Sequence, residues 1–395
     1  METILVTDGE QRAALALVRS YGRAGHRVYV CAGGRAKSLA GASRYCAGES
    51  TVRDPLDDAE GFVADVRSLI ERREVTVLVP VTDASLGAVL PRRDRLGDVV
   101  LPFPDAAAYE RASNKALVLE LARDLGIAVP AQHRIASPAD ATDIARSLTY
   151  PVVVKPSRSV ADSENGRLKL GVAYASNATE LDERLSELDR AAYPVLLQER
   201  VVGDGVGVFV LRWEGRCLAV FSHRRLREKP PSGGVSVYCE STAPDPALIA
   251  PSLALLERLG WNGVAMIEYK LDRASGRAYL MEINGRFWGS LQLAIDAGVD
   301  FPSLLLAAAT GSPPEPVRDY RVGVRCRWWW GDVDHLLLRL RRSATRLALP
   351  PNAPGRWRAL RDFLHLARRG DRNEVLRLDD PAPFLRETAD WVRRR

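Results

Sequence analysis

The first hundred residues alternate between short apolar runs and longer stretches of helical periodicity. The runs that predict strands are Thr3–Thr7, His26–Ala32, Val75–Pro80 and Val99–Phe103. The stretches that predict amphipathic helices are Arg12–Gly25 and Asp57–Arg73. Because regular alternation of strand and helix is typical of a parallel, Rossmann-like sheet, we expect residues 1–105 to form an α/β domain.

The turn after the first predicted strand lacks the glycine pattern that brings backbone close to a pyrophosphate. It reads Thr7–Gln11 and contains no G-x-G-x-x-G, so a dinucleotide site is not expected there. Asp83 follows the third strand, at the edge where open α/β sheets hold ligands. Contact with a ligand and capping of the next helix are the two interpretations of this residue.

Shorter elements fill the middle of the chain. A helix is expected from an N-cap at Ser113 through Arg123, and an apolar strand from Tyr150 to Pro156. The further expected elements are an acidic helix over 176–189, a strand over 195–198, a hairpin of Gly207–Leu211 with Cys217–Ser222, a basic loop over 223–234 and a helix over Ala247–Gly260.

The stretch Trp261–Ser290 predicts a β-hairpin that carries acidic side chains in apolar surroundings. One apolar run ends at Glu268, and the run after the turn carries Glu282 and ends at Asn284. Alternation in a strand places Glu282 and Asn284 on one face. A carboxylate inside an apolar run is costly to bury unpaired, so the charge of Glu282 needs compensation. With Glu268 on the partner strand, the three side chains form an oxygen site suited to Mg²⁺.

Residues 311–395 differ from the rest: they are proline-rich at first, then contain three consecutive tryptophans, then arginine-rich helical stretches. Apolar residues recur there at helical spacing, which predicts a helix that packs on the body of the protein. These residues are Trp357, Leu360, Leu364 and Ala367. Docking on a membrane surface or a partner is the alternative, because many arginines lie nearby. They include Arg339, Arg341, Arg342 and Arg346.

Composition narrows the class of protein. A chain of 395 residues with 46% hydrophobic content suffices for two or three domains with substantial cores. No apolar stretch is long enough for a membrane span and the N-terminus lacks a secretory pattern, so we expect a cytoplasmic protein. The five scattered cysteines favour a reduced protein without disulfides or a zinc site. The net charge of +6 is dispersed, so nucleic acid is not expected as a partner.

Lysine is rare in this chain, where arginine is the usual cation, so each lysine is a candidate for a role that needs a compact charge. Lys155 closes a buried apolar strand and needs an anionic partner or an exit to solvent. Lys115 falls in the first turn of its helix, where the helix dipole disfavours a cation. A solvated surface lysine and an anion ligand are the two interpretations of Lys115.

Glu268, followed by the motif E-I-N-G-R at Glu282–Arg286, resembles the metal and phosphate signature of the ATP-grasp superfamily, in particular its carbamoyl-phosphate synthetase and biotin carboxylase branch. The resemblance covers roughly residues 1–310. It implies an α/β (α+β) architecture, the ATP-grasp fold, with a Rossmann-like first domain. The implied parts are a pre-ATP-grasp domain (1–105), a small lid subdomain (106–195), a large catalytic subdomain (196–310) and a basic helical C-terminal extension (311–395).

The resemblance further implies that ATP and Mg²⁺ bind here, with Mn²⁺ as an alternative ion. Lys115 and Lys155 look like the two phosphate lysines of the family. The implied metal ligands are Glu268, Glu282 and Asn284. The strand over 195–198 and the residues after it resemble the hinge that binds adenine, with an acidic residue for the ribose. The implied hinge residues are Gln198, Glu199, Arg200 and Val201, and the ribose ligand is Asp204.

Basic residues are the implied catalytic groups. Arg286 lies one step beyond the metal ligands, where it can grip an anionic group. Arg225 and Lys229, in the basic loop, are candidates to bind phosphate or the substrate carboxylate, and an ordinary solvated loop is the alternative. For His223 we leave a base and a packing role open.

The segment after Lys155 departs from the glycine-rich lid of the family. Only Gly166 precedes Gly171, so few bare backbone amides are available to wrap phosphates. Hydroxyl groups and the side chains of Arg158 or Arg167 are the candidates to replace them.

The resemblance implies a ligase that joins a small carboxylic acid to an amine through an acyl phosphate and releases ADP and phosphate. A homodimer is the default expectation for its assembly. One alternative is a carboxylase or carbamoyl-phosphate-like enzyme that uses bicarbonate. Another is a nucleotide-binding regulator with weakened catalysis. The identity of the acid and the amine is not encoded in any spacing of the chain.

Overall fold

The structure is a computed structural model that describes residues 1–34, 37–163, 166–312, 314–349, 353–365 and 370–394. The N-terminal part contains a four-stranded parallel sheet in the order β3-β2-β1-β4. Its strands are β1 (Thr3–Val6), β2 (Arg27–Ala32), β3 (Gly48–Thr51) and β4 (Val77–Val79). The parallel sheet predicted from the alternation of strand and helix is confirmed.

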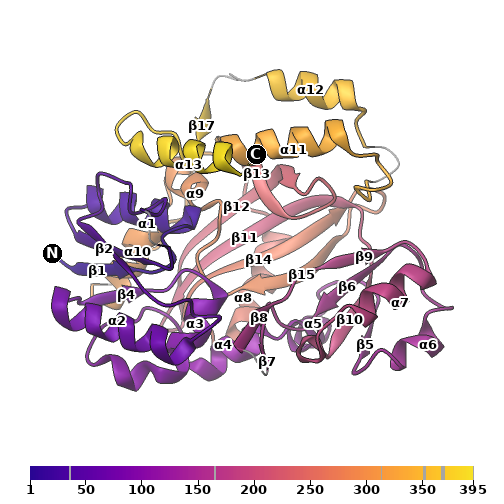
Figure 1. Ribbon diagram of the computed structural model, residues 1–395, viewed down its shortest axis with the longest axis horizontal. Coiled ribbons are helices and arrows are strands. Elements are labelled where there is room, and N and C mark those ends of the chain that lie inside the picture. Colours follow the sequence, from indigo (N-terminus) through magenta and orange to yellow (C-terminus); the bar gives the residue numbers. More distant parts are fainter. Residues whose placement is uncertain (35–36, 164–165, 313, 350–352, 366–369, 395) are drawn as a thin grey trace.

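Helices α1 (Arg12–Arg23), α2 (Ala59–Arg73) and α3 (Asp83–Val89) cover this sheet (Figure 1, indigo and purple), and the 3₁₀ helix η1 (Leu90–Leu96) follows α3. The apolar pattern does not predict β3, because the sequence Gly-Glu-Ser-Thr contains no apolar run. The strand predicted at Val99–Phe103 is wrong, since Val100 makes only an isolated parallel bridge with Val77.

Two short helices lead from this domain into the next. They are α4 (Ala106–Ser113) and α5 (Lys115–Asp124). The predicted N-cap at Ser113 is wrong by one residue, because Ser113 ends α4. Asn114 caps α5 instead, where its side-chain oxygen accepts from the backbone N–H of Leu117.

The small subdomain is a four-stranded sheet in the order β5-β10-β6-β9 with helices on one side. Its strands are β5 (Gln132–Ile135), β6 (Val152–Pro156), β9 (Ala173–Ala175) and β10 (Val195–Glu199), and its helices are α6 (Asp140–Ile144), α7 (Ala178–Ser186) and the 3₁₀ helix η2 (Arg190–Ala192). A separate hairpin of β7 (Val160–Ser163) and β8 (Gly166–Lys169) projects toward the first domain. This subdomain has its own apolar core.

A seven-stranded sheet in the order β15-β14-β11-β12-β13-β16-β17 forms the centre of the molecule (Figure 1). Its strands are β11 (Gly203–Trp213), β12 (Arg216–Lys229), β13 (Val235–Ser241), β14 (Gly263–Asp272), β15 (Ala278–Asn284), β16 (Arg325–Arg327) and β17 (Asp371–Asn373). The associated helices are α8 (Pro246–Arg258), α9 (Leu291–Ala297) and α10 (Phe301–Ala309). The main core of the molecule is continuous from the N-terminal sheet into this one.

The basic loop predicted over 223–234 is wrong for most of its length. Residues 223–229 continue strand β12, which pairs with β13, and only the segment 230–234 connects the two strands. Charged residues are tolerated in this strand because acidic side chains on neighbouring elements pair with them. Arg224 pairs with Glu240, and Arg227 with Asp332.

The C-terminal extension contributes strands as well as helices. Its strands β16 and β17 add to the edge of the central sheet, beside β13. Its helices are α11 (Trp329–Arg341), α12 (Arg356–Leu364) and α13 (Ala382–Arg393), which lie above the sheet in Figure 1.

The spacing of the apolar residues in α12 predicts that they pack on the body of the protein. Only some of them do so. Trp357 is 81% exposed and Leu364 is 58% exposed, whereas Phe363 packs against the ring of Trp329. Ala367 lies outside the described residues. Arg339 is only 7% exposed, so it cannot belong to a surface patch that docks on a membrane.

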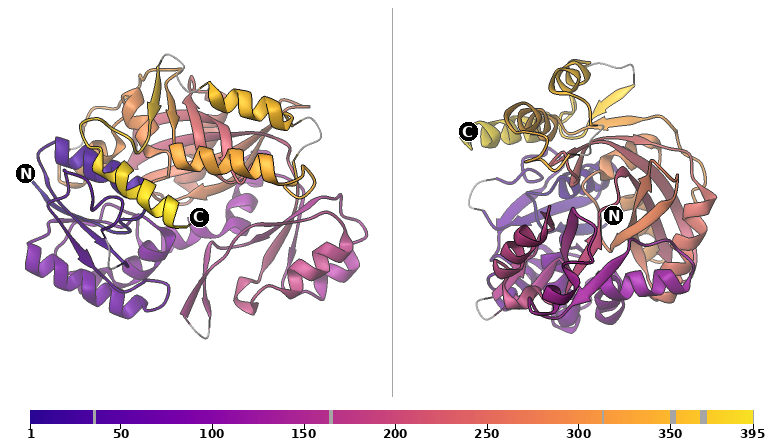
Figure 2. Two further views of the ribbon diagram at one scale, coloured as in Figure 1. Left: turned by 45° about the horizontal axis from the view of Figure 1, so that its top comes forward. Right: turned by 90° about the vertical axis from the view of Figure 1, so that its right-hand side faces the viewer.

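The C-terminal extension packs against the first domain (Figure 2). Arg19 in α1 is buried and donates to the Asp380 carboxylate at 2.8 Å, and Arg12 at the start of α1 pairs with Glu374. The extension is therefore joined to the first domain as well as to the central sheet.

No single helix in the described part of the chain is long and apolar enough to cross a membrane. The pair α9 and α10 passes the same test together, with a bend of 91° between them, and most of their residues are buried in the core.

Candidate active site

The register of the hairpin places the two predicted carboxylates opposite each other. Glu268 in β14 pairs with Glu282 in β15, and Met266 pairs with Asn284. Because side chains alternate along a strand, Glu282 and Asn284 face the same side. All three oxygen-bearing side chains line one cavity of about 660 Å³ between the central sheet and the small subdomain.

Glu282 lies between two buried lysines. The Nζ atoms of Lys115 and Lys155 are each 3.6 Å from Glu282 Oε2. Burial alone would raise the pKa of the Glu282 carboxyl, but the charges of Lys155 and Lys115 lower it to about 2. The two lysines that the sequence analysis identified therefore supply the positive charge that compensates the buried carboxylate of Glu282.

The two lysines come from different elements. Lys115 begins α5 and donates from Nζ to Ser159 Oγ at 2.9 Å. Lys155 lies in β6 and donates from Nζ to the Met281 carbonyl at 2.8 Å. Burial and the charge of Lys115 lower the pKa of Lys155, although Glu282 opposes the shift. Lys115 is 8% exposed, so the interpretation as a solvated surface lysine is wrong.

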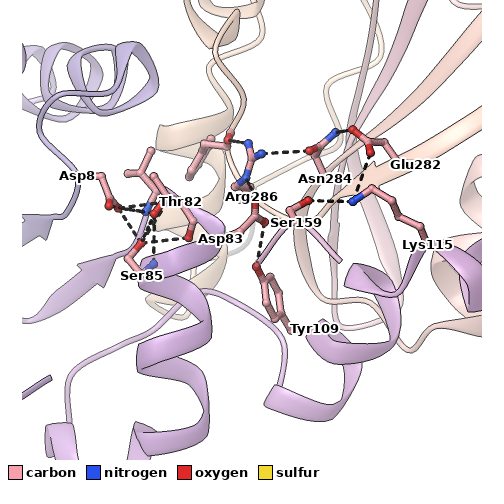
Figure 3. A network of polar contacts seen from close by, with 12 residues as sticks. Asp8, Thr82, Asp83, Ser85, Tyr109, Lys115, Ser159, Glu282, Asn284 and Arg286 are labelled. Carbon is pink, nitrogen blue, oxygen red and sulfur yellow. Dashed lines mark hydrogen bonds and ion pairs between the residues drawn. The ribbon is translucent and has the colours of Figure 1, made fainter. Parts of the chain in front are cut away.

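Asn284 and Arg286 extend this group toward the first domain (Figure 3). Asn284 donates from Nδ2 to Glu282 Oε1 at 3.4 Å, and its Oδ1 accepts from Arg286 at 3.1 Å. Arg286 also donates from Nε to Asp83 Oδ2 at 2.9 Å. Burial raises the pKa of the Asp83 carboxyl, but Arg286 more than offsets this effect and the pKa is lowered. Asp83 therefore holds Arg286.

Asp83 is not the cap of α3. Thr82 caps the helix, with Ser85 completing a capping box. Asp8, just after β1, orders this turn: its carboxylate accepts from the backbone N–H of Thr82 at 3.1 Å and from Ser85 Oγ at 2.7 Å (Figure 3). Tyr109 in α4 donates to Asp83 Oδ1 at 3.0 Å. The first domain thus positions Arg286 at the site.

Glu268 takes part in a second charged group. Arg225 binds it with two hydrogen bonds and also donates to Glu228 Oε1 at 2.9 Å. The ammonium of Lys270 lies 3.5 Å from Glu228 Oε2. Although burial opposes it, the carboxylates of Glu268 and Glu228 raise the pKa of Arg225. Arg225 therefore lies at the cavity, as its candidate role requires.

Lys229 is not brought to the cavity. It ends β12 and its Nζ lies 2.5 Å from Asp334 in α11, away from Glu268 and Glu282. Its side chain also lies over the ring of Trp328. The strand that replaces the expected loop accounts for this placement, because Lys229 falls where β12 meets the C-terminal extension.

The residues predicted to form the adenine hinge also line the cavity. They are Gln198, Glu199, Arg200, Val201 and Asp204. Gln198 is buried and donates from Nε2 to Gln132 Oε1 at 2.9 Å, whereas the side chain of Glu199 is exposed. Arg200 lies over the ring of Tyr174. Asp204 pairs with Arg273 at 2.5 Å.

The two lid arginines contact different parts of the chain. Arg158 pairs with Glu110 in α4 at 2.7 Å. Arg167 donates from its backbone N–H to the Leu56 carbonyl at 2.8 Å and from its side chain to the Ala84 carbonyl at 3.0 Å. Both line a second cavity, which is also lined by Lys115 and shares Glu282 and Asn284 with the first one.

His223 lines the first cavity beside Arg225 and is 1% exposed. Neither of its ring nitrogens has a hydrogen-bond partner among the described residues, and its ring makes an edge contact with Phe209 at 4.6 Å between centroids. Burial lowers the pKa of His223 to about 3, and the charge of Arg225 adds to the shift. The imidazole is therefore neutral near pH 7.

The donor set fits a magnesium ion rather than a softer metal. Within the described residues no three or more His, Cys, Asp or Glu side chains gather closely enough to hold a metal alone. The site instead offers two carboxylates and one amide oxygen, which suits an ion that takes further oxygens from phosphates and water. Arg225 donates one hydrogen bond to each oxygen of Glu268, and Glu282 contacts the two lysines and Asn284. A carboxylate oxygen has a second lone pair, which is the group that an ion would use here.

Comparison with known proteins agrees with this geometry. Residues 192–330 match a family described as "ATP-grasp in the biosynthetic pathway with Ter operon". The carbamoyl phosphate synthase large chain of Thermotoga maritima is 24% identical over 307 residues, which are 70% of this chain and 26% of that protein. The urea amidolyase of Lachancea kluyveri is 24% identical over 233 residues, 55% of this chain and 12% of that protein. The chain thus spans about a quarter or less of these relatives.

Two solved structures have a similar architecture. The L-amino acid ligase of Bacillus licheniformis superposes with a TM-score of 0.61 at 19% identity, covering 80% of this chain and 75% of that one. The biotin carboxylase of Campylobacter jejuni, described as a beta-gamma-ATP complex, superposes with a TM-score of 0.64 at 15% identity, covering 82% of this chain and 74% of that one. The chain has the ATP-grasp fold, and the resemblance found in its motifs is confirmed.

Proposed function

We propose that this protein is an ATP-dependent ligase that joins a carboxylic acid to an amine through an acyl phosphate. The observation that carries the proposal is the position of Glu282, ionised between Lys115 and Lys155 in a cavity between two sheets. Phosphoryl transfer depends almost entirely on positioning and electrostatic stabilisation, and this arrangement supplies both. The names of the similar structures, among them a ligase and a biotin carboxylase, support the same class of chemistry.

Each group has a defined role in the proposed reaction. Lys115 and Lys155 hold the phosphates of ATP, with the adenine at the hinge that includes Arg200 and Val201. Mg²⁺, when held by Glu268, Glu282 and Asn284, neutralises charge on the phosphate oxygens. Arg286, fixed by Asp83, and Arg225 bind the anionic groups of the acid and of the transferred phosphoryl group.

The proposed reaction needs no covalent intermediate between substrate and enzyme. A carboxylate oxygen of the acid attacks the terminal phosphorus of ATP, and the bond to the bridging oxygen of ADP breaks. The nitrogen of the amine then attacks the carbonyl carbon of the acyl phosphate, a proton leaves the nitrogen, and inorganic phosphate departs.

Two other functions fit parts of the same site. An enzyme that uses bicarbonate as its acid would share these residues, and the resemblance to carbamoyl phosphate synthase favours this candidate. A regulator that binds nucleotide without turnover would fit the glycine-poor lid. For the assembly we propose a homodimer, because a similar biotin carboxylase domain from Hydrogenobacter thermophilus is described as a dimer.

Release of ADP from Mg–ATP tests these functions against one another. The purified protein is assayed with a panel of acids, a panel of amines, and bicarbonate. We expect ADP release only when an acid and an amine are both present. Release that depends on bicarbonate alone would assign the carboxylase function, and nucleotide binding without release across the whole panel would assign the regulator.

A further inference from the structure

A third cavity of about 500 Å³ lies between the small subdomain and the C-terminal extension. Four arginines line it, and the described lining contains no aspartate or glutamate. These arginines are Arg200, Arg339, Arg342 and Arg356. We call this cavity the arginine pocket. It concentrates positive charge in a chain whose net charge is only +6.

Arg339 is the most informative of the four. It is 7% exposed, and its side chain donates to the carbonyl of Pro354 but to no carboxylate in the described part of the chain. The other arginines buried as deeply, Arg19 and Arg327, donate to Asp380 and Asp332. A buried charge without a counter-ion is costly, so the arginine pocket needs negative charge that the described residues do not supply.

The other three arginines of the pocket form no ion pair with any residue that the structure describes. Arg200 donates to the carbonyl of Ala348, and Arg356 donates to the carbonyl of Arg342 at 3.2 Å. Burial lowers the pKa of Arg339, and the nearby charge of Arg356 adds to this effect. Their guanidinium groups keep hydrogen-bond donors of the kind that bind phosphate in pairs.

The arginine pocket adjoins the first cavity. Arg200, Arg339 and Leu349 line both. Arg200 belongs to the proposed hinge, whereas the two lysines that would hold the phosphates of ATP lie at Glu282. The nucleotide phosphates at the lysines therefore leave the arginine pocket open to a second anion.

We propose that the arginine pocket binds a second small molecule that carries a phosphate or diphosphate group, separate from the phosphates of ATP. Four guanidinium groups match a multiply charged oxyanion better than a single carboxylate. The proposal rests on Arg200 and three arginines of the extension, and it goes beyond the ligase function, which requires only one phosphate site.

Titration calorimetry of the full chain with inorganic pyrophosphate, without metal, tests the proposal. The variants are Arg339→Met and the double variant of the exposed residues, Arg342→Met with Arg356→Met. The control is Arg346→Met, which removes an exposed arginine of the same segment that does not line the pocket. We expect the pocket variants to weaken binding about tenfold or more, and the control to leave it unchanged.

A repeat with saturating ADP separates this site from the nucleotide site. Pyrophosphate that still binds confirms the arginine pocket, and pyrophosphate displaced by ADP, or bound equally by every variant, overturns it. Ribose 5-phosphate is the second probe. If it binds more tightly than pyrophosphate, the ligand is an organic phosphate. If pyrophosphate binds more tightly, the ligand is inorganic. Failure of ADP to bind would refute the ligase function alone, because the comparison of variants needs no nucleotide.

Discussion

At the scale of single residues, the site is organised by the pairing of buried charges. The sequence alone shows that Glu282 sits in an apolar run and that lysines are rare, and from these facts a charged partner for Glu282 could be predicted. Its partners Lys115 and Lys155 are distant in sequence, and the family motif was needed to connect them. The supporting residues Asp8, Ser159 and Tyr109 could not be predicted, because no local spacing indicates which turn they contact.

Replacement of Asp83 by asparagine tests how the first domain positions Arg286. The variant removes the charge that fixes the guanidinium while it keeps the shape of the side chain. We expect kcat for ADP formation to fall about 10- to 100-fold, as for other residues that orient a ligand-binding group. Asp98→Asn, at an exposed carboxylate, is the control. Equal kcat in both variants would contradict the positioning role.

The burial of His223 predicts how the free energy of unfolding depends on pH. Its pKa is about 3 in the folded protein and 6.5 when exposed, so the unfolded chain binds more protons between these values. The contribution of His223 to the free energy of unfolding is therefore fully present above pH 6.5, and it is lost as the pH falls toward 3. We expect the free energy of unfolding, measured in urea, to drop more between pH 7.5 and pH 5 for the wild type than for His223→Gln. Equal drops would contradict the burial of a neutral imidazole.

At the scale of elements, strands with a clear apolar pattern could be predicted and polar strands could not. The sequence predicts the hairpin of β14 and β15, with its carboxylates on paired strands, because two apolar runs flank a stretch of turn-forming residues. The second half of β12 reads as a basic loop since its arginines are matched by carboxylates on other elements. Such pairing is a tertiary property that the local pattern does not contain.

Gly203 offers a test of the connection between the small subdomain and the central sheet. It begins β11, directly after the hinge, and an added Cβ would lie 1.9 Å from the carbonyl oxygen of Leu271. We expect Gly203→Ala to force the ends of β11 and β14 apart, to lower the free energy of unfolding by about 1–3 kcal/mol, and to weaken ADP binding. Gly171→Ala, at a position with open space, is the control for both measurements.

At the scale of the whole molecule, the C-terminal extension ties the first domain to the central sheet. The sequence shows that residues 311–395 are a distinct segment, and its helices could be predicted. Its strands could not, because β16 and β17 are short and polar. Its attachment through Arg19 and Asp380 joins residues 361 positions apart, which no local pattern reveals.

Asp380→Asn tests this attachment. Arg19 and Asp380 are both about 1% exposed at their side chains, so removal of one charge leaves the other buried and unpaired. We expect a loss of about 3–5 kcal/mol in the free energy of unfolding, because a broken buried ion pair is strongly destabilising. The matched control is Asp379→Asn, since Asp379 is 48% exposed and pairs with the exposed Arg23. A loss equal to that of the control would show that the extension is not held through this contact.

The central claim is that Glu282, held ionised by two lysines, organises the phosphates of ATP for transfer to an acid. The most direct test is the rate of ADP formation by Glu282→Gln, compared with the wild type and with Glu257→Gln at an exposed position of α8. We predict a fall in kcat of about 100- to 1000-fold for Glu282→Gln, with unchanged circular dichroism, and no fall for the control. Undiminished ADP formation by a folded Glu282→Gln variant would contradict the claim.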